Sequence, residues 1–254
     1  MIFASNLFYF KKSVSGQVLQ LTYFDPEVLP TALASFAARL KPVSTPAAAF
    51  KRIAETTVDR VLFSSLETHR RDALALVRYV GMPEIDEPPL KAFSWDGTAV
   101  RTGSAASVLI HEVAHWLVAS PERRALPDFG LGPGPETGRT ELAEAARCVG
   151  DDKREEEELL ASLLGILLEA SLGQPAISAF IEQNWLEAWD RPAAANQFLI
   201  TVEKLLTRGL IDASGLPVLL QDGSVATAAI SIRNSGHASA LTSTIADAGP
   251  SLGK

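Results

Sequence analysis

VLIHEVAHWLV, residues 108–118, contains the pattern H-E-x-x-H, in which Glu112 follows His111 and His115 completes the motif. Residues four apart lie on one face of an α-helix about one turn apart, so the two imidazoles could bind one metal ion. The other residues of the stretch are apolar, which predicts that this helix is buried. A buried imidazole needs a partner for its polar nitrogens. The alternative is a pair of structural histidines; we favour a metal site because two of the chain's four histidines fall at this spacing.

Glu112 is the candidate catalytic residue of this motif. On a helix it is rotated by about 100° from His111. From that position it could reach a metal-bound water without being a ligand itself. We therefore predict that Glu112 handles protons, while the two histidines hold the metal.

The third metal ligand is expected from a later helix. An H-E-x-x-H helix supplies two ligands, and a carboxylate commonly completes such a site while leaving a coordination position open. Residues 151–168, DDKREEEELLASLLGILL, predict a long helix that carries four consecutive glutamates. We select Glu158 because small residues continue its helix face and would let this helix approach the histidine helix closely: Ala161, Ser162 and Gly165. Residues 155–157 stay open as alternatives, since the leucines on their faces could equally point to the core.

The composition describes a globular protein and excludes several classes of partner. The chain has 254 residues, of which 47% are hydrophobic and 21% charged, and its formal net charge is −7. This negative charge argues against a nucleic acid or an anionic membrane surface as partner. Cys148 is the only cysteine, which excludes an internal disulfide and a cysteine-based zinc site. No apolar run approaches the ~20 residues of a membrane span, and the first lysines follow the apolar N-terminal stretch, the wrong order for a secretory signal. We expect a soluble, cytoplasmic protein.

The expected fold class is α+β and predominantly helical, with the H-E-x-x-H helix packed on the second ligand-bearing helix. A strand at residues 17–24 would form a small N-terminal β element. We divide the chain into an N-terminal α/β region of unknown role, a helical metal-site domain and a flexible tail, at residues 1–100, 101–221 and 222–254.

Local patterns predict further elements along the chain. The expected helices are residues 25–40, 67–80, 140–149, 175–189 and a further helix after residue 192. Asp96-Gly97 predicts a two-residue hairpin turn, and Ser104 is the expected cap of the metal-motif helix. Residues 119–139 are rich in glycine and proline, and this long loop is a candidate for the lip of the active site; an exposed connector is the alternative.

The segment from His111 to Arg139 resembles the elongation factor P hydroxylase family. Members carry H-E-x-x-H-W, a double arginine, an Asp-Phe-Gly and a loop that ends in Gly-Arg. Here these elements lie at residues 111–116, 123–124, 128–130 and 138–139. A following acidic and then Ala/Leu-rich helix is also similar, so the resemblance covers about residues 104–175. The family's loop after Asp-Phe-Gly is aromatic, whereas residues 131–137 read LGPGPET.

The resemblance implies a metal-dependent enzyme that hydroxylates a modified lysine on a protein substrate, with elongation factor P as the candidate. His111, His115 and Glu158 would hold a divalent metal ion, iron or zinc, and Glu112 would manage protons. Two histidines and a carboxylate with open positions are also the ligand set of non-haem iron oxygenases.

Two alternatives use the same motif. In a zinc metallopeptidase, the metal lowers the pKa of a bound water to ~7 and Glu112 acts as general base. A structural zinc in a binding protein is less favoured, because structural zinc sites usually have four protein ligands.

Overall fold

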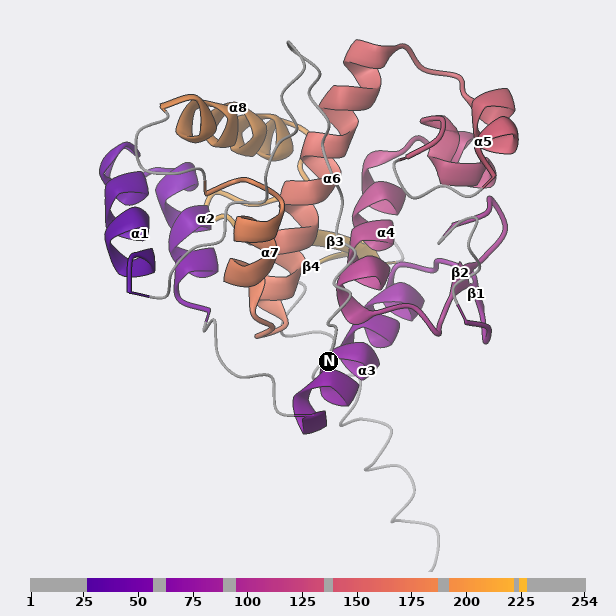
Figure 1. Cartoon of the computed structure of the whole chain (residues 1–254), viewed down its shortest axis with the longest axis horizontal. Helices are drawn as coiled ribbons and strands as arrows, with labels where there is room; N and C mark the ends of the chain where they lie inside the picture. The colour runs from indigo at the N-terminus through magenta and orange to yellow at the C-terminus, as the bar shows by residue number, and fades with distance from the viewer. Residues whose placement is uncertain are drawn as a thin grey trace, which may run out of the picture.

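The computed structural model describes residues 27–56, 63–88, 95–134, 139–186, 192–221 and 224–227. Over these residues the chain is mostly helical with two small two-stranded sheets, which confirms the predicted α+β, predominantly helical class (Figure 1). The helices are α1 (Leu29–Ala38), α2 (Thr45–Ala54), α3 (Phe63–Tyr79), α4 (Ala106–Val118), α5 (Thr140–Ala146), α6 (Asp151–Ser171), α7 (Ala176–Glu182) and α8 (Pro192–Thr207), with short 3₁₀ helices η1 (Arg123–Ala125) and η2 (Pro127–Gly130). The strands are β1 (Glu84–Ile85), β2 (Val100–Arg101), β3 (Val218–Gln221) and β4 (Ser224–Thr227).

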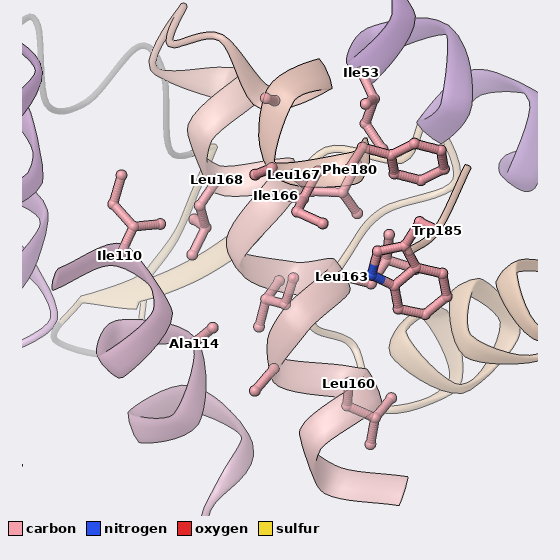
Figure 2. Close-up of a cluster of buried hydrophobic side chains, with 14 of the residues drawn as sticks. Ile53, Ile110, Ala114, Leu160, Leu163, Ile166, Leu167, Leu168, Phe180 and Trp185 are labelled. Atoms are coloured by element: carbon pink, nitrogen blue, oxygen red, sulfur yellow. The ribbon is translucent and has the colours of Figure 1, made fainter. Parts of the chain in front are cut away.

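Helix α6 runs through the centre of the molecule. Its first turn carries Asp151 and Asp152, whose negative charges stabilise the N-terminus of a helix by interacting with the helix dipole. From residue 160 to residue 169 every side chain is buried, as expected for a helix covered on all sides. Figure 2 shows Ile110 and Ala114 of α4 on one side of α6, and Phe180 and Trp185 on the other. Helix α6 therefore separates the α4 side of the core from the α2 and α7 side.

The contact between α4 and α6 is close because α6 presents a glycine there. A Cβ atom added to Gly165 would lie 3.7 Å from His111 Cα and 3.8 Å from Ala114 Cβ. This confirms that a small residue of α6 faces the histidine helix. Ser162 points elsewhere: its hydroxyl accepts a hydrogen bond from Trp185 Nε1 at 2.8 Å and donates one to Gln183 Oε1.

An aromatic cluster lies in the core between the N-terminal helices and the C-terminal ones. The rings of Phe36 and Phe50 stack at 4.6 Å between centroids, and Phe36 meets Phe180 and Phe198 edge-on at 5.6 and 5.5 Å. Such edge-to-face pairs stabilise the fold by more than the burial of their apolar area alone. Described residues on both sides of residue 100 therefore belong to one hydrophobic core.

The structure differs from the predicted hairpin at Asp96-Gly97. Trp95 and Val100 form a single antiparallel bridge, and Asp96 Oδ1 accepts hydrogen bonds from the Thr98 and Ala99 backbone nitrogens at 2.9 and 3.1 Å. Strand β2 then pairs in parallel with β1 instead of continuing a hairpin. The antiparallel bridge encloses a four-residue turn in place of the predicted two-residue turn, and residues 92–94 of the expected hairpin lie outside the described residues.

The predicted cap of the metal-motif helix was also wrong. The N-cap position of α4 is occupied by Ala105, and Ser104 lies one residue earlier. The Ser104 hydroxyl oxygen is buried and has no hydrogen-bond partner within the described residues.

Several predicted helices are present with shifted ends, and parts of the chain lie outside the described residues. Helix α7 ends at Glu182, earlier than expected, and Asn184 adopts a positive φ of 60° just beyond it. Strands β3 and β4 were not predicted, and they pair with each other in antiparallel orientation. The strand expected at residues 17–24 and the rest of the predicted tail lie outside the described residues. None of the described helices is long and apolar enough to cross a membrane.

The close contact at Gly165 predicts opposite results for two substitutions. Gly165→Ala places its Cβ in ordinary van der Waals contact and raises helix propensity by about 1 kcal/mol, so the free energy of unfolding should stay level or rise. Gly165→Leu should force α4 and α6 apart and lower it by about 1–3 kcal/mol. Urea unfolding followed by circular dichroism measures both; equal stability of the two variants would contradict the observed packing.

Candidate metal centre

Helix α4 brings the two histidines of the motif together in the protein interior. His111 and His115 are only 6% and 5% exposed, and their Nε2 atoms lie 3.0 Å apart. Their rings are nearly perpendicular, with centroids separated by 4.6 Å. Two nitrogen ligands about 2.1 Å from one ion would lie about 3.0 Å apart at the 90° angle of an octahedral site and about 3.4 Å apart at the tetrahedral angle. The spacing of these atoms therefore fits two ligands on a single metal ion.

Helix α6 adds a carboxylate to this pair. Glu158 Oε2 lies 3.5 Å from His115 Nε2, and the Glu158 side chain is 20% exposed. One ligand atom from each of His111, His115 and Glu158 lies within 4.8 Å of the others, and the described residues contain one such group of histidine and acidic side chains. Imidazole nitrogens with a carboxylate oxygen are donors that zinc and iron both accept. The three residues could therefore hold a divalent metal ion.

The neighbouring glutamates of α6 have other contacts. Glu157 accepts a hydrogen bond from Arg123. Glu156 Oε2 lies 3.1 Å from Lys204 Nζ, and Glu156 Oε1 accepts a hydrogen bond from Arg208. Glu155 is exposed. Of the four consecutive glutamates, Glu158 is the one that the structure places beside the histidines.

The surroundings favour the metal-binding protonation state at His111 and Glu158, but not at His115. Burial, together with the charge of His115, lowers the pKa of His111 to about 3, against the opposing effect of Glu158. Burial also disfavours protonated His115, but Glu158, Glu112 and Glu157 outweigh it and raise the pKa of His115. Burial by itself would raise the pKa of Glu158, but the two histidines and Arg154 outweigh this effect and lower it. His111 is thus neutral and Glu158 ionised, as ligation requires, whereas the raised pKa of His115 means that this imidazole would release a proton on binding a metal.

Glu112 lies inside the same buried region. It is 8% exposed, and its charge contributes to the raised pKa of His115. The structure therefore places the predicted catalytic glutamate within electrostatic reach of one predicted ligand.

The loop after α4 contacts the site through two side chains. The Phe129 ring stacks on the His115 ring, with centroids 5.4 Å apart and planes inclined by 18°. Arg123 donates to Glu157 Oε1, and both side chains are largely buried. Neither residue was predicted to contact the site, although both belong to the Arg-Arg and Asp-Phe-Gly elements on which the family resemblance rests. The described part of this loop therefore lies beside the candidate site, and its role as the lip of an active site stays a prediction.

Comparison with known protein families identifies the same segment. The model of the elongation factor P hydroxylase family matches residues 94–147. This match supports membership of the elongation factor P hydroxylase family. It covers about a fifth of the chain, from the turn before β2 through α4 and the loop to α5. The hydroxylase match thus includes His111 and His115 but ends before Glu158, which is placed by the structure alone. Neither the curated proteins nor the solved structures contain a match to the chain.

The buried pair of Arg123 and Glu157 predicts a strong coupling between the loop and α6. Arg123→Met would leave the Glu157 carboxylate, whose side chain is 2% exposed, without its counter-charge. We expect the free energy of unfolding to fall by about 3–5 kcal/mol. The double variant Arg123→Met/Glu157→Gln should recover much of this loss, as measured by urea unfolding.

Arg71 supplies the matched control for this experiment. Its side chain is 72% exposed and pairs with Asp72 at 3.5 Å on the surface. Arg71→Met should lower the free energy of unfolding by less than about 1 kcal/mol. Equal losses in the Arg123 single and double variants would show that the buried pair does not couple the two segments.

Proposed function

We propose that this protein is a metal-dependent hydroxylase of the elongation factor P hydroxylase type, which hydroxylates a modified lysine on a protein substrate. The observation that carries the proposal is the group formed by His111, His115 and Glu158. Its two histidines lie within the segment that matches the family. Three protein ligands leave coordination positions open, as a catalytic site needs and a structural zinc site usually does not.

The proposed roles follow from the donor atoms of each side chain. His111 and His115 hold the metal through Nε2, and Glu158 holds it through a carboxylate oxygen. When bound, iron would supply the activation of dioxygen that hydroxylation of a C–H bond requires. Glu112 carries protons or orients water beside the metal, which needs a carboxylate that is not itself a ligand.

The burial of these residues suggests how the substrate reaches the site. The two histidines and Glu112 are at most 8% exposed, whereas the Glu158 side chain is 20% exposed. On the side of His115 the stacked ring of Phe129 is fully buried. We propose that the lysine side chain of the substrate approaches past Glu158, with elongation factor P as the candidate substrate protein.

A zinc metallopeptidase with Glu112 as general base would use the same side chains. The family match gives this alternative no support, since the matched family is one of hydroxylases. Metal identity and oxygen dependence separate the two activities.

The test combines the metal, the substrate and Glu112. Protein purified without added metal should contain iron, and with dioxygen and ascorbate as reductant it should add one oxygen atom to the modified lysine of elongation factor P. The other oxygen atom leaves as water with electrons from ascorbate. Mass spectrometry of the substrate measures the product. Glu112→Gln should keep the metal and slow turnover about 100-fold or more.

Glu122→Gln serves as control, because Glu122 is an exposed glutamate of the following loop. This variant should match the unaltered protein in metal content and turnover. Zinc together with oxygen-independent peptide cleavage would overturn the hydroxylase proposal. Loss of metal in Glu112→Gln would instead make Glu112 a ligand and overturn its assigned role.

A further inference from the structure

The ring of His115 lacks the hydrogen bond that usually orients a metal-binding histidine. Such a histidine normally donates its second ring nitrogen to a carboxylate or carbonyl group, which fixes the ring's orientation. His115 Nδ1 is buried and has no hydrogen-bond partner among the described residues. The described polar contacts of this ring are therefore at Nε2, with His111 and Glu158, and nothing polar fixes it at Nδ1.

A column of flat rings packs against His115. Phe129 stacks on it at 5.4 Å, and Trp95 stacks behind Phe129 at 5.6 Å with planes inclined by 10°. Trp95 is itself held, because its Nε1 donates to the Arg124 carbonyl at 3.1 Å. Phe129 and Trp95 are each 1% exposed. The imidazole thus packs against a buried pair of stacked aromatic rings.

The backbone that carries Phe129 adopts an unusual conformation. Asp128, Phe129 and Gly130 have positive φ angles of 45°, 53° and 70° in succession. For a residue other than glycine this conformation costs roughly 1 kcal/mol or more, and such strain clusters at functional sites. At Gly130 an added Cβ would lie 2.6 Å from Cys148 Sγ, so the cysteine would have to move, and the positive φ would strain any other residue there. The left-handed turn places the Phe129 ring on His115.

We propose that Phe129 is a positioning residue of the metal centre. Its ring, supported by Trp95, fixes the orientation of the His115 imidazole so that Nε2 faces His111 Nε2 and Glu158. This inference rests on the proposed function, because it assigns Phe129 to the proposed metal site. A residue that only fills the core would affect stability, whereas a positioning residue also affects metal affinity.

The experiment compares two substitutions of buried phenylalanines. Phe129→Leu removes the aromatic ring that stacks on His115. Phe198→Leu removes an aromatic ring from the cluster that it forms with Phe180 and Trp185. Each purified variant is titrated with Co²⁺, whose visible spectrum reports the geometry of its ligands, and unfolded in urea. Both variants should lose stability. Only Phe129→Leu should weaken Co²⁺ binding, by about tenfold, and alter the spectrum.

Two further variants keep the proposal testable if Phe129→Leu does not fold. Phe129→Tyr retains the flat ring and should bind Co²⁺ nearly as tightly as the unaltered protein. Trp95→Leu removes the support behind Phe129 and should weaken binding. Unchanged Co²⁺ affinity in Phe129→Leu or, if it does not fold, in Trp95→Leu would overturn the positioning role. Failure of the unaltered protein to bind Co²⁺ would overturn the metal site itself, and the role of Phe129 with it.

Discussion

The close packing of α4 on α6 is the constraint on which the candidate site depends. Gly165 lets the two helices approach until an added Cβ would lie 3.7 Å from His111 Cα. Two turns earlier on α6, Glu158 comes within 3.5 Å of His115 Nε2. A wider separation of the helices would leave the two buried imidazoles of α4 without a carboxylate beside them. A packing contact therefore sets the chemistry of the site.

The loop after α4 contacts both helices of the candidate site. Arg123 pairs with Glu157, the residue next to Glu158, and so joins the loop to the turn of α6 that carries Glu158. A few residues later, Phe129 covers one face of His115. The loop thus contacts both helices at the site, through an ion pair on one side and an aromatic stack on the other. The elements after H-E-x-x-H that match the hydroxylase family have a structural role in this protein.

Local patterns predicted most of the described helices, although not α2, and they placed the three candidate ligands in one hypothesis. The spacing of His111 and His115 is a property of one helix, and Glu158 was selected from the small residues that continue its face. The contacts of Phe129 and Arg123 and the pairing of β1 with β2 join segments distant in sequence, so no local period encodes them. Ser104 failed as a cap because α4 begins one residue later. The division into residues 1–100, 101–221 and 222–254 remains a prediction, as does the identity of the metal.

Metal content in two glutamate variants of α6 tests the account most directly. Glu158→Ala removes the proposed third ligand, and Glu155→Ala changes an exposed glutamate of the same run. After identical purification and elemental analysis, Glu155→Ala should retain the metal content of the unaltered protein, and Glu158→Ala should lose most of it. Full metal content in Glu158→Ala would show that α6 does not supply the carboxylate of the site.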